Sequence, residues 1–145
     1  MIYVDTSFLA PLYIEETTSL QVEAYLRSQP PRQISISEWT QVEFASLVSR
    51  RVRMGELESE QVLTIFHTFE ADCTNIYTVL NVSSLDFQLA TSLLRQDKTT
   101  LRAGDALHLA IAQNHQVQEF LTLDKALANT AQTFGLAVSN GGIDL

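Results

Sequence analysis

The stretch Met1-Ile-Tyr-Val-Asp-Thr-Ser7 decides how this chain is expected to fold. Its first four residues are apolar, aromatic or β-branched, which is typical of a buried strand. Thr6 or Ser7 then offers a hydroxyl group that can cap a helix, so the strand is predicted to pass directly into a helix. Asp5 therefore stands at the carboxyl end of a strand, the edge where α/β proteins bind their ligands.

Strands and helices are predicted to alternate along the rest of the chain. Short apolar or alternating runs predict further strands at 34–36, 76–80, 120–123 and 136–138. Apolar residues at helical spacing and capping residues predict helices at about 6–13, 17–26, 38–53, 56–72, from 83–84 onward, 104–114 and 125–134. Strands joined by helices through short connections form a parallel sheet covered on both faces. The sequence predicts a helix-rich three-layer α/β/α sandwich, built as a single domain of residues 1–145.

The longest of these predicted helices carries its own start and stop signals. Ser37 is a suitable N-cap for a helix from Glu38 to about Arg53. Gly55 follows the helix and suits the left-handed conformation that ends many helices. These two signals fix the predicted bounds of the helix.

The composition is that of a globular protein with an acidic surface. The chain of 145 residues is 46% hydrophobic and 18% charged, and its 9 basic and 17 acidic residues give a net charge of −8. This balance argues against tight nonspecific binding to nucleic acid, which depends on Lys and Arg contacts to phosphate. It leaves open a nucleic-acid enzyme whose metal ions supply the local positive charge. It also suits a basic protein partner.

The compartment is predicted from what the sequence lacks. The single cysteine, Cys73, excludes an internal disulfide and fits a reducing cytoplasm. No apolar run reaches the roughly 18 residues that span a bilayer, and the chain opens with no signal-peptide pattern. We therefore expect a cytoplasmic protein without a membrane partner.

Three aspartates lie at predicted junctions between strands or loops and helices: Asp5, Asp105 and Asp124. Each could simply cap a helix, which typically stabilises it by about 1 kcal/mol. The carboxyl ends of parallel strands meet at one edge of the sheet, however, so the three could also share a site. Carboxylates gathered without basic partners usually hold a divalent cation. Capping and metal binding are compatible, because one carboxylate has lone pairs for both.

Glu43 is a fourth candidate, because it lies within a predicted helix on a partly apolar row. Trp39 and Leu47 flank it at a spacing of four residues. A carboxylate in such surroundings is costly unless a partner binds it. Arg50 or a metal ion could be that partner.

The only histidine near these acids in sequence is His108, three residues after Asp105. That spacing can bind zinc or iron, but the sequence supplies no further His or Cys ligands for zinc. His108 is therefore expected to be packed or to support a neighbouring ligand. An oxygen-only ligand set favours Mg²⁺ or Mn²⁺.

The one basic cluster of the chain is Arg50-Arg-Val-Arg53. Basic residues at a helix end usually complement the helix dipole in solvent. They could instead contact phosphate beside the acids, together with Lys98, Arg102 and Lys125. Both interpretations stay open at this point.

Four segments resemble the PIN domain family, and within it the single-domain toxins of the VapC type. They are Val4-Asp-Thr-Ser-Phe-Leu-Ala10, Val42-Glu-Phe-Ala-Ser-Leu-Val-Ser-Arg-Arg51 with Gly55 behind it, Leu101-Arg-Ala-Gly-Asp-Ala-Leu-His-Leu-Ala110, and Leu121-Thr-Leu-Asp124. The resemblance covers nearly the whole chain, and the order and spacing of the segments are specific.

The resemblance implies a metal-dependent endoribonuclease that acts as the toxin of a toxin–antitoxin pair. Its acids match Asp5, Glu43, Asp105 and Asp124, which would hold Mg²⁺ or Mn²⁺ and activate a water for attack on RNA. Thr6, Ser7 and Thr122 match small polar residues that hydrogen-bond the ligands or the waters of the metal. The candidate phosphate contacts are Arg50, Arg102 and Lys125. The resemblance also implies a homodimer and a small antitoxin partner that carries basic residues to the acids.

Three other functions fit the sequence less well. A haloacid-dehalogenase-type phosphatase would need a second Asp at the position of Ser7, and a receiver domain would need an acid after the strand that ends at Leu80. A non-catalytic RNA- or partner-binding scaffold of the same fold is the serious alternative. The full set of four acids argues against that alternative, and the shortage of Lys and Arg argues for it.

Overall fold

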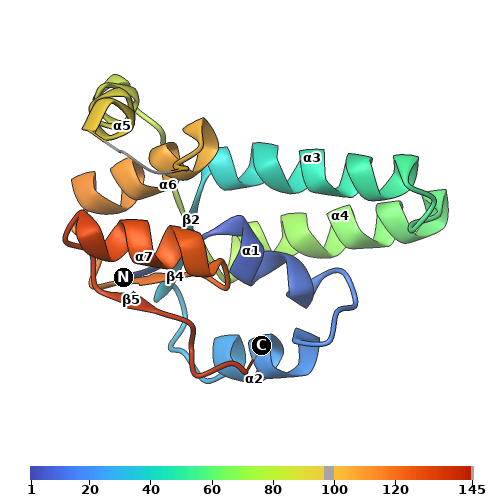
Figure 1. The fold of residues 1–145 in the computed structure, drawn as a ribbon. Coiled ribbons are helices and arrows are strands. Elements are labelled where there is room, and N and C mark those ends of the chain that lie inside the picture. Colours follow the sequence, from blue (N-terminus) through green and yellow to red (C-terminus); the bar gives the residue numbers. More distant parts are fainter. Residues whose placement is uncertain (97–99, 145) are drawn as a thin grey trace.

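A parallel five-stranded sheet between layers of helices forms the centre of the computed structural model, which describes residues 1–96 and 100–144 (Figure 1). The strands are β1 Ile2–Val4, β2 Ile34–Ser37, β3 Thr78–Leu80, β4 Glu119–Leu121 and β5 Val138–Ser139. They lie in the order β3-β2-β1-β4-β5, and every neighbouring pair is parallel. The predicted α/β/α sandwich is confirmed.

The strand order reverses at β1, which lies in the middle of the sheet. From β1 the chain proceeds outward through β2 to β3, and then returns to the other side of β1 with β4. In open parallel sheets the ligand crevice lies beyond the carboxyl ends of the strands at such a reversal. The register pairs Val4 with Leu121, so the residues that follow them begin side by side.

Seven α-helices and one short 3₁₀ helix cover the sheet within the described residues. They are α1 Thr6–Leu9, η1 Ala10–Leu12, α2 Ser19–Arg27, α3 Glu38–Arg53, α4 Ser59–Asn75, α5 Ser84–Gln96, α6 Ala103–Asn114 and α7 Lys125–Thr133. Figure 1 shows α3 and α4 extending together past the edge of the sheet, and Phe44 of α3 packs on Phe66 and Phe69 of α4. No helix in the described ranges combines the length and the apolar character needed to cross a membrane.

The predicted signals at helix ends act as expected in α3. The Ser37 side chain accepts a hydrogen bond from the Thr40 backbone, and the Thr40 side chain accepts one from the Ser37 backbone. Gly55 has a left-handed φ of 77° just after this helix. The next helix was predicted from residue 56, but α4 begins at Ser59 because Glu58 and Gln61 form its capping box.

The two faces of the sheet bury separate clusters of apolar side chains. Ile2 and Val4 belong to one cluster with α1 and α3, while Tyr3 belongs to the other with β4 and α6. This division follows from the pleat, which points successive side chains of a strand to opposite faces. Tyr3 is stacked on Phe120 of β4 and is fully buried. Its hydroxyl group therefore needs a partner inside the protein.

All five predicted strands are present, but their bounds differ from the predicted ones by one or two residues at an end. β4 ends at Leu121 rather than at residue 123, because the Thr122 side chain accepts a hydrogen bond from the Asp124 backbone and turns the chain toward α7. β5 covers Val138–Ser139 rather than 136–138. Asp124 still caps the helix that follows it, α7, as its predicted junction position indicates.

Candidate active site

Asp5 lies at the carboxyl end of β1, where the register brings it next to the end of β4. Its side chain is 4% exposed, and it caps α1 by accepting a hydrogen bond from the Phe8 backbone at 3.2 Å. The Ser7 hydroxyl donates to it at 2.8 Å and the Thr122 hydroxyl at 3.0 Å. Burial raises the pKa of Asp5 to about 6, although His108 and these hydrogen bonds oppose the rise. Asp5 is thus a buried carboxylate held by both halves of the chain.

A second network of hydrogen bonds holds one carboxylate oxygen of Glu43. The Thr6 hydroxyl donates to Glu43 Oε1 at 2.6 Å, and His108 Nε2 lies 2.5 Å from the same oxygen. The other ring nitrogen of His108, Nδ1, lies 2.7 Å from the Tyr3 hydroxyl, which is 2.9 Å from the Ser37 hydroxyl. Each ring nitrogen of His108 thus has one hydrogen-bond partner, Glu43 at Nε2 and Tyr3 at Nδ1. The network thereby fixes both the ring of His108 and one oxygen of Glu43.

We call the residues of these two networks the closed side of the site: Tyr3, Asp5, Thr6, Ser7, Ser37, His108 and Thr122, with Oε1 of Glu43. His108 is 1% exposed, as expected for a packed residue. Within the described residues, no buried side-chain nitrogen or oxygen lacks a hydrogen-bond partner. The buried polar side chains of the closed side therefore all have hydrogen-bond partners within the protein.

The open side of the site is a cavity of about 420 Å³ that Glu43 helps to line. Its lining residues come from α3, from the start of α6 and from the start of α7: Trp39, Val42, Glu43, Ser46, Arg102, Gly104, Asp105 and Asp124. We call this cavity the acidic pocket. It brings together three of the four predicted acids, and Asp5 is not among its lining residues.

The acids of the acidic pocket keep free oxygens. Asp105 makes no side-chain hydrogen bond to any residue that the structure describes, and Asp124 accepts one from the Leu127 backbone at 3.1 Å. A Cβ atom on Gly104 would lie 2.9 Å from Glu43 Oε2, so the glycine leaves room for this second oxygen. The open side therefore presents carboxylate oxygens that a ligand could take.

Electrostatic interactions link the acids across the acidic pocket. Burial raises the pKa of Asp105, and the charges of Glu43 and Asp124 raise it further against the opposing effects of His108 and Arg102. Burial alone would raise the pKa of Glu43, but the hydrogen bonds and charge of the closed side outweigh it and lower the pKa. Repelling carboxylates near one cavity attract a cation.

The donor set suits a hard divalent cation, but its ligands are not gathered in advance. Among residues 1–96 and 100–144, no three His, Cys, Asp or Glu side chains form a cluster that could hold a metal ion. Carboxylates at the start of helices can rotate, and Mg²⁺ usually keeps several waters between itself and protein oxygens. The residues therefore fit a metal that is held by few direct ligands.

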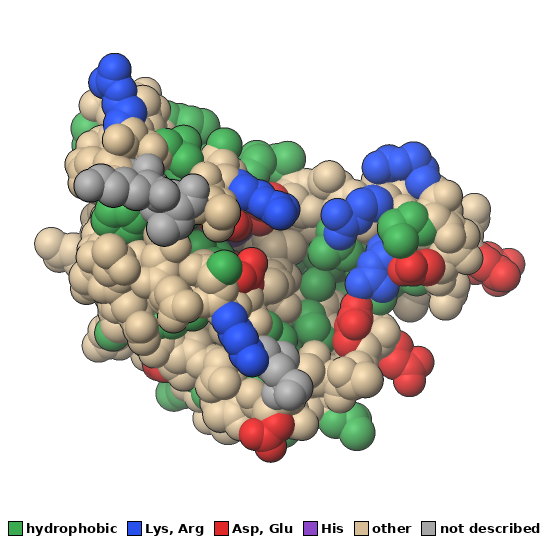
Figure 2. All heavy atoms as spheres, viewed as in Figure 1, with side chains coloured by type: hydrophobic (Ala, Val, Ile, Leu, Met, Phe, Trp, Pro, Cys, Tyr) green, Lys and Arg blue, Asp and Glu red, His purple; other side chains and the backbone are tan. Residues whose placement is uncertain are grey.

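The basic candidates lie around this site in different ways. Arg102 lines the acidic pocket, whereas Arg50 and Lys125 are exposed and do not line it. None of the three forms an ion pair or side-chain hydrogen bond within the described residues, while Arg51 is paired with Glu16 and Glu56. Figure 2 shows basic side chains around a recess that contains acidic ones. Lys98 lies outside the described residues.

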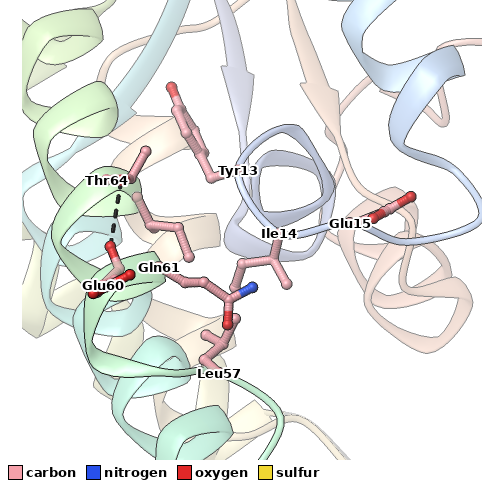
Figure 3. A pocket seen from close by; sticks show the side chains of 8 residues that line it. Tyr13, Ile14, Glu15, Leu57, Glu60, Gln61 and Thr64 are labelled. Carbon is pink, nitrogen blue, oxygen red and sulfur yellow. Dashed lines mark hydrogen bonds between the residues drawn. The ribbon is translucent and has the colours of Figure 1, made fainter.

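Another cavity, of about 410 Å³, lies between the end of η1 and α4 (Figure 3). Tyr13, Ile14 and Leu57 give it an apolar wall, and Glu15 and Glu60 also line it. It shares no lining residue with the acidic pocket. None of the four candidate acids lines this cavity.

Sequence reasoning missed several partners in this site. The sequence predicts Arg50 or a metal ion as the partner of Glu43, whereas in the structure His108 and Thr6 hydrogen-bond one of its oxygens. Tyr3 was assigned only to the core, although its hydroxyl orients His108. The sequence indicates only that the hydroxyl of a tyrosine on a central strand needs a buried hydrogen-bond partner, and not which residue this partner is.

These features define an α/β/α domain with an acidic site at the strand-order reversal. The chain belongs to the PIN domain family, whose family model matches residues 2–132. No curated protein sequence matches the chain.

Several solved structures share this fold over nearly their whole length. VapC20 of Mycobacterium tuberculosis, described as a toxin that cleaves the sarcin–ricin loop, has a TM-score of 0.72 and 21% identity, covering 94% of this chain and 97% of that one. FitAcB of Neisseria gonorrhoeae has a TM-score of 0.73 and 18% identity, with 97% and 98% covered. VapBC2 of Rickettsia felis, solved with a promoter DNA fragment, has a TM-score of 0.67 and 16% identity, with 96% and 98% covered. At these identities the likeness shows the fold.

Proposed function

We propose that this protein is a metal-dependent endoribonuclease and the toxin of a toxin–antitoxin pair. The observation that carries the proposal is the acidic pocket, in which Glu43, Asp105 and Asp124 line one cavity together with Arg102, which forms no ion pair with any described residue. Membership of the PIN family and the similarity to a toxin described as cleaving the sarcin–ricin loop support the same activity.

Asp105, Glu43 and Asp124 would hold Mg²⁺ or Mn²⁺, with Asp5 contributing from the closed side. A divalent ion supplies positive charge that polarises a phosphodiester and lowers the pKa of a water that attacks it. Burial raises the pKa of Asp105, and the charges of Glu43 and Asp124 raise it further; a bound cation would relieve the repulsion between these carboxylates, which supports this assignment.

The side chains of the protein would carry out the remaining work. His108 and Thr6 hold Glu43 Oε1, so that Oε2 faces the acidic pocket in a fixed position. Arg102 can bind a phosphate oxygen at the same cavity, and Arg50 and Lys125 can contact neighbouring phosphates of a longer strand. Fixed groups of this kind accelerate reactions because their orientation costs little in the transition state.

An antitoxin partner and a homodimer belong to the same proposal. Solved complexes with this fold include toxin–antitoxin pairs, such as VapBC2 and a complex from Klebsiella pneumoniae with a TM-score of 0.58 and 23% identity. A net charge of −8 favours a basic partner segment.

Cleavage of total RNA by the purified protein, freed of any partner, tests the activity. We expect discrete fragments with Mg²⁺ or Mn²⁺, none with EDTA, and none with the variant Asp105→Asn. Asp105 makes no side-chain hydrogen bond to the described residues, so this variant should fold normally. Intact RNA under every condition, with folded protein, would favour a non-catalytic RNA- or partner-binding scaffold.

A further inference from the structure

Trp39 is the only tryptophan of the chain, and it forms one end of the acidic pocket. It lies in the first turn of α3, after the Ser37 cap. Val42 and Glu43 follow it at helical spacing and line the same cavity. One wall of the acidic pocket therefore changes from aromatic and apolar to acidic within a single turn.

The indole ring of Trp39 is held in place by the start of α6. Its Nε1–H donates to the Gly104 carbonyl at 3.1 Å. A Cβ atom on Gly104 would lie 3.1 Å from Cζ2 of the ring, so the ring rests directly against the glycine backbone. Because the ring is fixed before any ligand arrives, a ligand that stacks on it would lose little additional side-chain entropy.

Core packing alone does not account for this apolar wall. Trp39 is only half-buried, although it contacts the core cluster beside α6. Val42 next to it is 57% exposed and lines a cavity that also contains three carboxylates. Apolar surface beside charged groups suits a ligand that has both a flat apolar part and a charged part.

A nucleotide has both parts. Nucleobases stack on aromatic side chains with little preference for sequence, and each stacked base is worth about 1–3 kcal/mol. The phosphate of the same nucleotide would lie toward Arg102 and the cation held by the acids. A base within a duplex is already stacked on its neighbours, whereas an unpaired base is free to bind an aromatic ring.

We propose that Trp39 and Val42 form a base-binding subsite of the acidic pocket for an unpaired nucleotide of single-stranded RNA, next to the bond that is cut. This proposal rests on the nuclease function proposed above.

Because no other tryptophan is present, fluorescence of Trp39 reports on this subsite directly. The protein is titrated with adenosine 5′-monophosphate in Mg²⁺, and with ribose 5-phosphate as the control that lacks a base. We expect saturable quenching by the nucleotide and none by the sugar phosphate. An unchanged signal with both ligands would overturn the subsite.

Variants test the same subsite through RNA. Val42→Ser should weaken binding of a single-stranded oligoribonucleotide in EDTA by about fivefold, because it removes apolar surface that the base would cover. The residue is exposed, so the fold should tolerate the change. Trp39→Leu should raise KM by about tenfold, while Trp39→Phe, which keeps an aromatic face, should stay near the wild-type KM. A wild-type KM for Trp39→Leu, together with wild-type binding by Val42→Ser, would overturn the subsite.

These outcomes separate the subsite from the activity. Quenching by the nucleotide without cleavage of any RNA would uphold the subsite and reject the nuclease. Metal-dependent cleavage without quenching, and without an effect of Val42→Ser, would uphold the nuclease and reject the subsite.

Discussion

Asp5 and Asp105 both stand at the start of a helix near the carboxyl edge of the sheet, but their surroundings differ. Asp5 is buried and accepts hydrogen bonds from Ser7, Phe8 and Thr122. Asp105 lies half-buried in the acidic pocket, and its side chain makes no hydrogen bond to the described residues. The polar groups of the closed side hydrogen-bond one another, whereas the open side presents carboxylate oxygens that a ligand could bind. Glu43 joins the two sides, since Oε1 belongs to one and Oε2 faces the other.

The largest effect on stability should come from breaking the closed side at its centre. His108→Ala would leave Glu43 and Tyr3 without their buried partner and open a cavity, so we expect a loss of about 3–5 kcal/mol in the free energy of unfolding. Urea denaturation in EDTA measures this loss. Tyr3→Phe removes one hydroxyl from the same network and should cost about 1–2 kcal/mol. Asp105→Ala on the open side serves as the matched control and should not lower the free energy of unfolding, because burial and neighbouring charges raise the pKa of Asp105 and disfavour its charged form. Equal losses for His108→Ala and Asp105→Ala would remove the distinction between the two sides.

A smaller effect should be a pH dependence of the free energy of unfolding that is caused by the titration of Asp5. Because its pKa in the folded protein is about 6, against an ordinary value of 3.8, the folded state holds a proton over this interval and the unfolded state does not. The free energy of unfolding should therefore fall as pH rises from about 4 to above 6, by up to about 3 kcal/mol from this group. Denaturation in EDTA at several pH values measures the fall.

The variant Asp5→Asn isolates that contribution, because the amide keeps the shape of the side chain and does not titrate. We expect a flatter stability curve for the variant between pH 4 and 7, and a variant at least as stable as the wild type at pH 7.5. A curve as steep as that of the wild type would show that other carboxyls cause the dependence.

A substitution at Gly104, where the closed and open sides meet, should have the smallest effect on stability and a larger effect on activity. Gly104→Ala puts a Cβ atom 2.9 Å from Glu43 Oε2, at the end of a side chain whose other oxygen is fixed. The carboxylate must rotate, and the helix position itself tolerates alanine, so we expect a stability change within about 1 kcal/mol. The rate of RNA cleavage should fall by about tenfold or more, because the position of a catalytic group sets the rate. Ala103→Gly, one residue earlier in α6, is the control for a change in helix propensity. Wild-type cleavage by Gly104→Ala would mean that Oε2 takes no part.

The sequence predicted the parts of this molecule that depend on local signals. The Ser37 cap, the Gly55 turn and the strand at Ile2–Val4 are each set by a few neighbouring residues, and the structure has all three. The acids at helix starts could be recognised for the same reason. Their convergence could be expected from the rule that parallel strands end at one edge.

The partners within the site could not be predicted, because they depend on contacts between distant residues. Tyr3 and His108 are separated by 105 residues, and Asp5 and Thr122 by 117. Which residues meet depends on the register of β1 with β4 and on how closely α6 approaches α3 at Gly104. The sequence shows only that a buried tyrosine hydroxyl must find a hydrogen-bond partner. It does not show which residue that partner is.

The position of β1 between β2 and β4 also bears on how the chain assembles during its synthesis. Asp5 leaves the ribosome long before Thr122, its hydrogen-bond partner 117 residues further along. Until β4 emerges and pairs with β1, a nascent chain has half of its central strand unpaired and neither Thr122 nor Asp124 at the site. Domains generally fold as units once their chain is available. The protein would thus remain without a finished site until β4 and the residues that follow it have been synthesised, and would then acquire the site in a single step.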